Sequence, residues 1–182
     1  GEAAGRRVAE MIEKSVIGLN AGTTFGTAAN YDIAPTVYGY LTHPHRSTKA
    51  DMTAPTSTNG GTVIDEVLEL RDLLYTKKHY GPYVVYLGTD YERYIDNDFK
   101  TNSEKTTRQR LMEIENIADV RRLDLLTGAN SDTVIVVQMT SDVVRAVNGM
   151  EITTMQWDSQ GGMKTHYRVL AIQVPQIRSD RT

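Results

Sequence analysis

The sequence predicts an α+β fold, and three observations support this class. An amphipathic helical pattern begins the chain, helix-start signatures surround a buried apolar run in its middle, and two strand patterns flank a glycine turn near its end. Because helices and strands do not alternate strictly, a doubly wound parallel sheet is less favoured than α+β.

Composition narrows the class of protein. The 182 residues are 40% apolar and 24% charged, which is typical of a soluble globular chain of one domain or two small ones. A net charge of −3 argues against a protein whose main task is to neutralise phosphate backbones. The chain has no cysteine, which excludes disulfides, thiolate metal sites and cysteine nucleophiles, and it has no apolar run of about 18 residues.

The N-terminal part predicts one helix, a loop and a short strand. Apolar residues recur at helical spacing over about four or five turns, at Val8, Met11, Ile12, Ser15 and Leu19. We expect this helix to end between Gly18 and Gly22 and a Gly- and Thr-rich flexible loop to follow over residues 21–30. Val37 to Leu41 predicts a short strand, closed by a turn at residues 43–47.

The middle of the chain predicts a helix followed by a central strand. Residues 51–61 form a polar connector, where a domain boundary is expected. Thr62 followed by Asp65 is a helix-start signature, and the helical spacing continues to a stop at Gly81-Pro82. The short β-branched and aromatic run Tyr83 to Leu87 predicts a buried strand at the centre of a sheet.

The remaining elements are shorter. The same start signature returns at Thr89 with Glu92 and at Thr106 with Gln109, and it predicts helices to about Asp96 and from Thr107 to about Glu115. Strands are expected at Val120 to Leu123, Val134 to Met139, Ile152 to Trp157 and Thr165 to Val174. The last two flank the turn at residues 158–162 and predict a long hairpin.

One set of side chains suggests metal chemistry. His43 and His45 alternate along an extended segment, so both imidazoles could face one metal ion, with Asp51 or His79 as a third ligand. The competing interpretation is a proline-containing turn with solvated histidines, which is the commoner case. His166 lies in a hairpin strand and is expected to be a packing or surface residue.

Other site patterns are weak, and we assign no catalytic, cofactor-binding or metal residue. No glycine-flanked serine elbow occurs. Residues 59–62, Asn-Gly-Gly-Thr, could cradle an anion before a helix, but no lysine follows in the right place and a helix cap explains them better. The stretch 104–122 carries balanced charges, which predict a solvated helix face or salt bridges between subunits, and the ten tyrosines allow the same two interpretations.

The order of elements resembles a known family. Residues 80–90, Tyr-Gly-Pro-Tyr-Val-Val-Tyr-Leu-Gly-Thr-Asp, are similar to the Gly-Pro-x-x-Leu-Val-Ile-x-x-Asp segment in the axial domain of encapsulins and tailed-phage major capsid proteins. Further similar segments follow in the same order, at residues 106–111, 115–120, 132–139 and 140–145. The first helix, residues 3–13, resembles the end of the spine helix. Each motif is short, and their order and spacing carry the resemblance.

The resemblance implies a Hong Kong 97-like capsid fold without its N-terminal arm and extended loop. Residues 1–58 and 150–182 would form a peripheral-type domain, and residues 59–149 an axial-type domain. The implied function is that of a major capsid protein, a structural shell protein and not an enzyme, which self-assembles into an icosahedral phage or prophage capsid. Its partners would be copies of itself, with packaged DNA or cargo on the inner face and no membrane.

The resemblance also implies a location and leaves alternatives. The protein would be made in the cytoplasm of a bacterial host and would reside in the virion capsid. The chain opens directly into a helical pattern without an initiator Met, which suggests a fragment or a processed product. The alternatives are the shell protein of an encapsulin nanocompartment and, from another class, a metal-dependent enzyme using His43 and His45.

Overall fold

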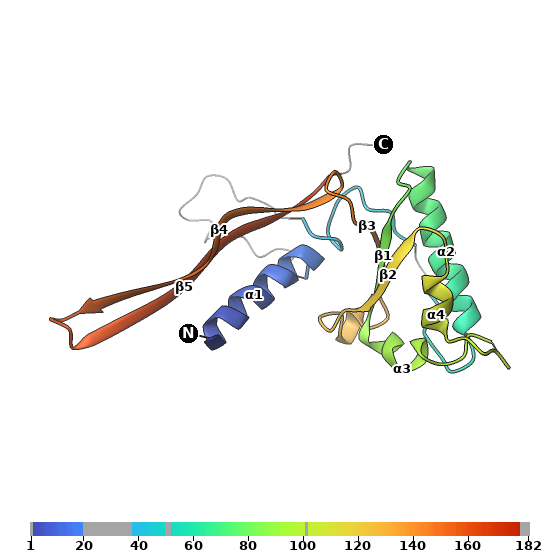
Figure 1. Ribbon diagram of the computed structural model, residues 1–182, viewed down its shortest axis with the longest axis horizontal. Helices are drawn as coiled ribbons and strands as arrows, with labels where there is room; N and C mark the ends of the chain where they lie inside the picture. The colour runs from blue at the N-terminus through green and yellow to red at the C-terminus, as the bar shows by residue number, and fades with distance from the viewer. Residues whose placement is uncertain (1, 20–37, 50–51, 101, 179–182) are drawn as a thin grey trace. The chain divides into compact units, whose positions relative to one another are not determined.

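The computed structural model describes residues 2–19, 38–49, 52–100 and 102–178 (Figure 1). The chain divides into two compact units. We call residues 1–46 with 144–178 the hairpin unit, and residues 47–143 with 179–182 the sheet unit. Helices and strands occur in both units, which confirms the α+β class. Whether the units correspond to peripheral-type and axial-type domains stays a prediction.

The sheet unit contains a three-stranded sheet, two longer helices and short helical turns. Its elements in chain order are α2 (Gly60–Thr76), β1 (Tyr83–Leu87), η1 (Thr89–Tyr91), α3 (Glu92–Ile95), α4 (Thr107–Met112), β2 (Ile117–Arg122), η2 (Gly128–Asn130) and β3 (Val134–Gln138). Strand β1 is central, parallel to β2 and antiparallel to β3. The prediction of a buried central strand at Tyr83 to Leu87 is therefore confirmed.

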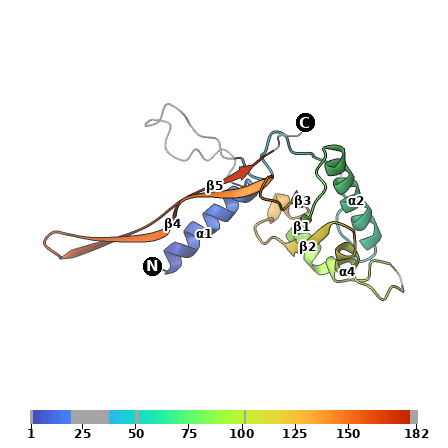
Figure 2. The same cartoon turned by 45° about the horizontal axis from the view of Figure 1, so that its top comes forward.

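Helices α2 and α4 pack on the sheet and enclose the core of this unit (Figure 2). Val67 of α2, Val85 of β1 and Leu111 of α4 are completely buried. The other members of the buried cluster come from α2, from β1 and the segment after it, from the segment after α4 and from β2: Val63, Ile64, Leu87, Tyr91, Ile95, Ile114, Ile117 and Val120. Apolar residues at helical spacing and at strand alternation thus meet in one continuous core.

The start of α2 differs from the prediction. The helix begins at Gly60 with Asn59 as its N-cap residue, so Thr62 and Asp65 lie inside the first turns and do not form the expected cap. The Asn59 side chain instead ties the preceding turn, because its Oδ1 accepts from the Thr56 N–H at 2.7 Å and its Nδ2 donates to the Ala54 carbonyl at 2.9 Å. The helix also ends at Thr76, before the expected stop at Gly81-Pro82.

The connector before α2 is anchored by a buried carboxylate. Glu66 is buried in α2, and its Oε1 accepts hydrogen bonds from the Thr53 N–H at 2.9 Å and the Thr53 hydroxyl at 2.7 Å. A buried carboxylate requires such donors, since an unpaired charge is costly away from water. The polar connector is therefore packed against the helix.

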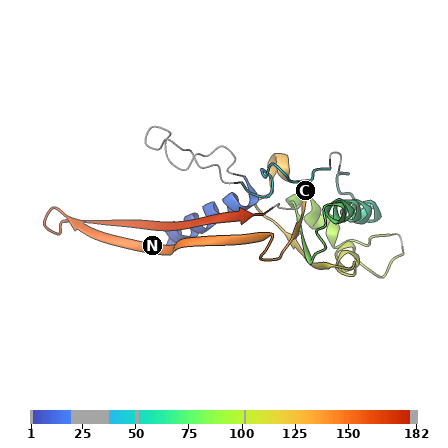
Figure 3. The same cartoon turned by 90° about the horizontal axis from the view of Figure 1, so that it is seen from above.

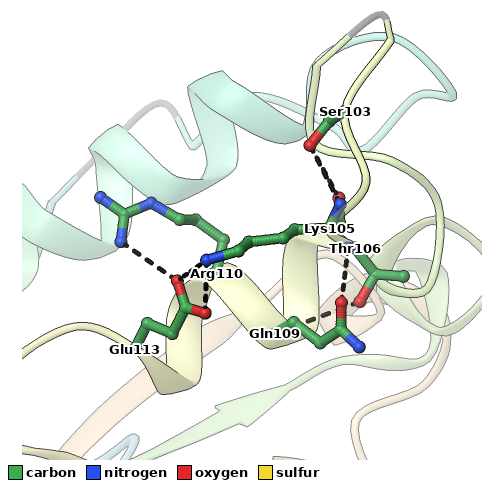
Figure 4. Close-up of polar contacts among 6 residues, drawn as sticks. All are labelled: Ser103, Lys105, Thr106, Gln109, Arg110 and Glu113. Atoms are coloured by element: carbon green, nitrogen blue, oxygen red, sulfur yellow. Dashed lines mark hydrogen bonds and ion pairs between the residues drawn. The ribbon is translucent and has the colours of Figure 1, made fainter.

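The predicted cap of α4 is confirmed. The Thr106 hydroxyl accepts from the Gln109 N–H at 3.3 Å, and the Thr106 N–H donates to Gln109 Oε1 at 3.1 Å, which is a capping box (Figure 4). The helix ends at Met112, before the expected end near Glu115. The other signature, at Thr89 and Glu92, marks a 3₁₀ turn followed by one α turn, with Gly88 and not Thr89 at the N-cap.

The charged stretch 104–122 forms ion pairs within the sheet unit. Lys105 lies 2.7 Å from Glu113, which Arg110 also approaches to 3.9 Å (Figure 4). Arg108 reaches Asp96 at 2.8 Å. These charged side chains lie on a solvated face, as one of the two interpretations predicted, and several of them pair with each other within the chain.

Strand bounds differ modestly from the predictions. Strand β2 covers Ile117–Arg122, so the expected strand at Val120 to Leu123 starts three residues too late and extends one residue too far. Strand β3 covers Val134–Gln138 and confirms the expected strand except for its last residue.

In its described residues, the hairpin unit contains one helix and two long antiparallel strands. Helix α1 covers Glu2–Ile17, β4 covers Val144–Ser159, and β5 covers Lys164–Ile177. The helix runs along part of the hairpin and packs mainly on β5, while the hairpin tip projects beyond the N-terminus of α1 (Figure 1, Figure 3). The predicted long hairpin is confirmed, and both strands extend beyond the predicted bounds.

The predicted strand at Val37 to Leu41 is wrong where the structure describes it, from residue 38 onward. These residues form a turn that caps the end of α1, because the N–H groups of Tyr40 and Leu41 donate to the Val16 and Ile17 carbonyls at 2.9 and 2.8 Å. Tertiary hydrogen bonding at a helix end thus overrides β-propensity. Gly18 ends α1 with a φ of 92°, as expected for a helix stop. The loop predicted at residues 21–30 lies outside the described residues.

None of the helices in the described ranges combines the length and apolar character needed to cross a lipid bilayer.

Candidate interaction surface

The two candidate histidine ligands lie together in a turn of the hairpin unit. Their ring centroids are 5.9 Å apart, and His43 Nδ1 accepts a hydrogen bond from the His45 N–H at 3.3 Å. Partial burial, and next the charge of His45, lower the pKa of His43, which favours its neutral form. Of the third ligands considered, Asp51 lies outside the described residues and His79 belongs to the sheet unit.

No group of three or more His, Asp or Glu side chains in the described part of the chain is arranged to hold a metal ion. The turn interpretation of His43 and His45 agrees with this geometry, since residues 44 and 45 form a turn. The metal-dependent enzyme therefore gains no support from the arrangement of these two side chains.

The candidate anion cradle at residues 59–62 is occupied by protein. Gly60 is buried, and a β-carbon there would lie 2.5 Å from Thr107 Oγ1 and 2.8 Å from Phe99 Cα. Glycine is thus required because the segment before α4 packs directly on the start of α2. The N-terminus of α2 is therefore in contact with Phe99 and Thr107, where the anion was considered.

Two tyrosines of the core have raised pKa values. Burial raises the pKa of Tyr83 to about 12 and that of Tyr91 to about 12. Both phenols therefore keep their protons at neutral pH. Tyr83 uses its hydroxyl to donate to the His79 carbonyl, which holds the chain between α2 and β1.

The β4–β5 hairpin has two different faces. Residues that pair across an antiparallel ladder point to the same side, and successive pairs alternate. One face, which we call the open face, contains the pairs Arg145/Gln176, Val147/Val174, Met150/Ile172, Thr153/Leu170, Met155/Arg168, Trp157/His166 and Ser159/Lys164. The covered face contains the pairs Val144/Ile177, Ala146/Pro175, Asn148/Gln173, Thr154/Val169, Gln156/Tyr167 and Asp158/Thr165.

Contacts between paired side chains agree with this division. On the open face, the rings of Trp157 and His166 stack at 5.3 Å with an interplanar angle of 10°. His166 also lies 2.9 Å from the Ser159 hydroxyl, so the prediction of a packing or surface histidine is confirmed. On the covered face, the Thr165 hydroxyl donates to Asp158 at 2.8 Å.

Helix α1 explains the burial of the covered face. The helix packs on β5, where Pro175 is buried and Val169, Ala171 and Gln173 are half-buried. On the open face, exposed apolar side chains extend along most of the hairpin: Val147 (48%), Met150 (41%), Met155 (51%), Trp157 (47%), Ile172 (57%) and Val174 (44%). A row of apolar side chains with this exposure is unusual for a monomer surface and is typical of an interaction surface.

Two β-bulges in β4 keep this apolar row on one face. The register shifts once between Asn148 and Met150, and again between Met150 and Thr153, so β4 has two extra residues relative to β5. Gly149 lies at the first bulge, where a β-carbon would lie 2.9 Å from Ile172 Cγ2. The missing side chain at Gly149 leaves room for Ile172 on the open face.

A model of a family of unknown function, DUF6260, matches residues 21–181. The chain belongs to this family. The matched range includes nearly all of the sheet unit and the whole β4–β5 hairpin. A comparison with curated proteins finds no match.

The two units of this DUF6260 member carry opposite formal charges. The hairpin unit has eight Lys and Arg against six Asp and Glu, a charge of +2, whereas the sheet unit has twelve against seventeen, a charge of −5. Together they give the −3 of the whole chain. Every Lys, Arg, Asp or Glu at a paired position of the open face is basic, namely Arg145, Lys164 and Arg168.

Sequence reasoning did not single out the open face of this family member. The hairpin was predicted, but simple alternation along β4 places Gly149 and Glu151 in line with Val147 and Met155. Because of the bulges, Met150 lies on the open face in place of Gly149 and Glu151. A one-residue shift of this kind is hard to recognise in the alternation of apolar and polar residues. The available signal was the single Trp of the chain, at Trp157 in an otherwise polar strand end.

Proposed function

We propose that this protein is a structural shell protein with a Hong Kong 97-like fold, and that it acts as the major capsid protein of a phage or prophage. The observation that carries the proposal is the long hairpin whose α1-covered face is opposite a face of exposed apolar side chains. Such a surface supports a function that is performed by association.

The order of elements gives further support. In the proposed fold, α1 is the end of the spine helix, the sheet unit is the axial-type domain, and the hairpin is the terminal part of the peripheral-type domain. The Gly81-Pro82 segment leads directly into the central strand β1, as the resemblance implies. The protein would be made in the host cytoplasm and reside in the virion, with copies of itself as partners and packaged DNA on the inner face.

The test is the association state of the full-length protein. We expect light scattering and negative-stain electron microscopy to detect ring-shaped capsomers or closed shells as the concentration rises. Monomers at every concentration would contradict the proposal. Neighbouring portal and protease genes would identify a phage capsid, whereas a neighbouring ferritin-like or peroxidase gene would identify an encapsulin, which has the same architecture.

A further inference from the structure

We propose that the open face of the β4–β5 hairpin is an interface to a second copy of this chain, and that it packs against the acidic sheet unit of that copy. The inference rests on the proposed function, and it adds the surface and the geometry of contact. It predicts a heterologous contact, in which two different surfaces of the same chain meet.

The open face is large enough to form a substantial part of an interface. A strand of 16 residues such as β4 is about 50 Å long at about 3.3 Å per residue, and two strands with their side chains are about 10 Å wide. The open face therefore has a flat footprint on the order of 500 Å², and its protruding side chains increase the accessible area further. An ordinary protein interface buries about 800 Å² on each partner, so this face supplies more than half of one side.

The centre of the open face is apolar. Among the described residues, the two strands pair only with each other, and α1 packs on β5 from the covered side. A two-stranded hairpin is marginally stable in water unless other elements pack on it, and α1 packs on one of its two faces. The row from Val147 to Trp157 is an apolar surface on the other face, and its aromatic and methionine side chains are residue types enriched at interface centres.

The charge of the open face selects the partner surface. Two open faces packed against each other would bring the basic residues Arg145, Lys164 and Arg168 together without an acidic partner at any paired position. The sheet unit carries a formal charge of −5 and is therefore the complementary part of a second copy. Charge thus favours contact between the hairpin unit of one chain and the sheet unit of another.

A heterologous contact of this kind repeats. Each copy offers one open face and one sheet unit, so a contact between two copies leaves one open face and one sheet unit free for further copies. Such contacts close into rings when the rotation between copies is a simple fraction of a turn, and otherwise continue as open chains. The open face is thereby suited to a capsomer.

The only Trp of the chain, Trp157, lies on the open face and reports on the contact directly. Tryptophan emission and acrylamide quenching of the full-length protein are followed while its concentration is raised and association is measured by light scattering. We expect a blue shift and at least a roughly threefold loss of quenching as particles form. Particles in which Trp157 stays fully quenchable would overturn this inference and leave the proposed function standing.

Matched variants separate the two faces of one strand. Ile172 and Tyr167 are both exposed apolar residues of β5, at 57% and 66%, but Ile172 lies on the open face and Tyr167 on the covered face. We expect Ile172→Glu to weaken association at least about tenfold, because it places a charge in the apolar row, and Tyr167→Glu to change it less than about threefold. Ile172 packs against Gly149, so a change at Ile172 could also disturb the bulge. Met155→Glu repeats the test on the open face at a position away from Gly149.

Charge reversal tests the geometry. We expect Arg168→Glu to weaken association and to reduce its salt dependence, because the partner surface is acidic. Stronger association of Arg168→Glu would indicate contact between two open faces and overturn the heterologous contact. Equal protection of Trp157 from quenching in monomers and particles would mean that another part of the same chain covers the open face, and would likewise overturn the inference. Absence of any association would contradict the proposed function itself.

Discussion

The two units of the chain bury their apolar residues to very different degrees. Of the 17 buried hydrophobic residues other than proline among the described ones, 16 lie in the sheet unit, and Ile17 alone lies in the hairpin unit. Of the 15 exposed large apolar residues, 11 lie in the hairpin unit. The sheet unit therefore has a core of its own, whereas the hairpin unit leaves most of its large apolar side chains exposed. Under the proposed function, stability and association would reside in different parts of the chain.

The largest expected effect tests the core of the sheet unit. Leu111 is completely buried in α4, so Leu111→Ala removes packed atoms and leaves a cavity. We expect the free energy of unfolding to fall by about 2–5 kcal/mol, measured by urea denaturation. The control Val174→Ala, at a 44% exposed position of the hairpin, should cost less than about 1 kcal/mol in the unassociated protein. Equal losses would contradict the contrast between the units.

A smaller effect tests the close contact between α1 and the turn that follows it. A β-carbon at Gly39 would lie 2.3 Å from the Gly18 nitrogen and 2.6 Å from the Ser15 carbonyl oxygen. We expect Gly39→Ala to destabilise the hairpin unit by about 1–3 kcal/mol, and to speed amide exchange at Tyr40 and Leu41, because the backbones must separate.

Gly5 provides the matched control for Gly39. Gly5 lies in α1, the helix that the Gly39 turn contacts, and a β-carbon at Gly5 would meet nothing within 4 Å. Gly5→Ala should stabilise α1 by about 0.5–1 kcal/mol, since alanine lowers the conformational entropy that the helix loses on folding. Destabilisation by Gly5→Ala would contradict the described packing of α1.

The third prediction compares two similar sequence signatures. Thr106 caps α4, whereas Thr62 lies inside α2 and is exposed. We expect Thr106→Ala to reduce the free energy of unfolding by about 1 kcal/mol, and Thr62→Ala to change it by less than about 0.5 kcal/mol. Thermal unfolding followed by circular dichroism measures both. A larger loss for Thr62→Ala would move the start of α2 back to the predicted position.

The smallest expected effect is a pH dependence of the hairpin unit. Burial lowers the pKa of His43 below its ordinary value of 6.5, so the unfolded chain takes up this proton first as the pH falls. The contribution of His43 to stability is therefore present above about pH 6.5 and is lost below it. We expect His43→Gln to flatten the pH dependence of unfolding between about pH 5 and 7. An unchanged slope would contradict the partial burial of His43.

Elements that depend on local chemistry were predicted well from the sequence. The bounds of β1 agree with the apolar run from Tyr83 to Leu87, because a short β-branched run has few other ways to be buried. The capping box at Thr106 and Gln109 was also predicted, since both of its hydrogen bonds join neighbours in sequence. Local hydrogen bonding and burial were sufficient in both places.

Elements that depend on distant partners were predicted poorly. The residues from Tyr38 to Leu41 have strand propensity, but their N–H groups cap α1 instead. Asn59, rather than Thr62, marks the start of α2, because the turn that it ties cannot be recognised from spacing alone. The open face was missed for the same reason, since it depends on the pairing of β4 with β5 and on the position of α1.

Each of the two bulges of β4 absorbs one residue that has no counterpart in β5, so the pairs on either side of a bulge stay in step. Deleting one extra residue would therefore remove one bulge and leave Trp157 paired with His166 on the open face. Deleting both would give a regular ladder with the same pairs toward the tip. Among natural variants, the loss of one residue in this stretch should therefore be tolerated as readily as the loss of two.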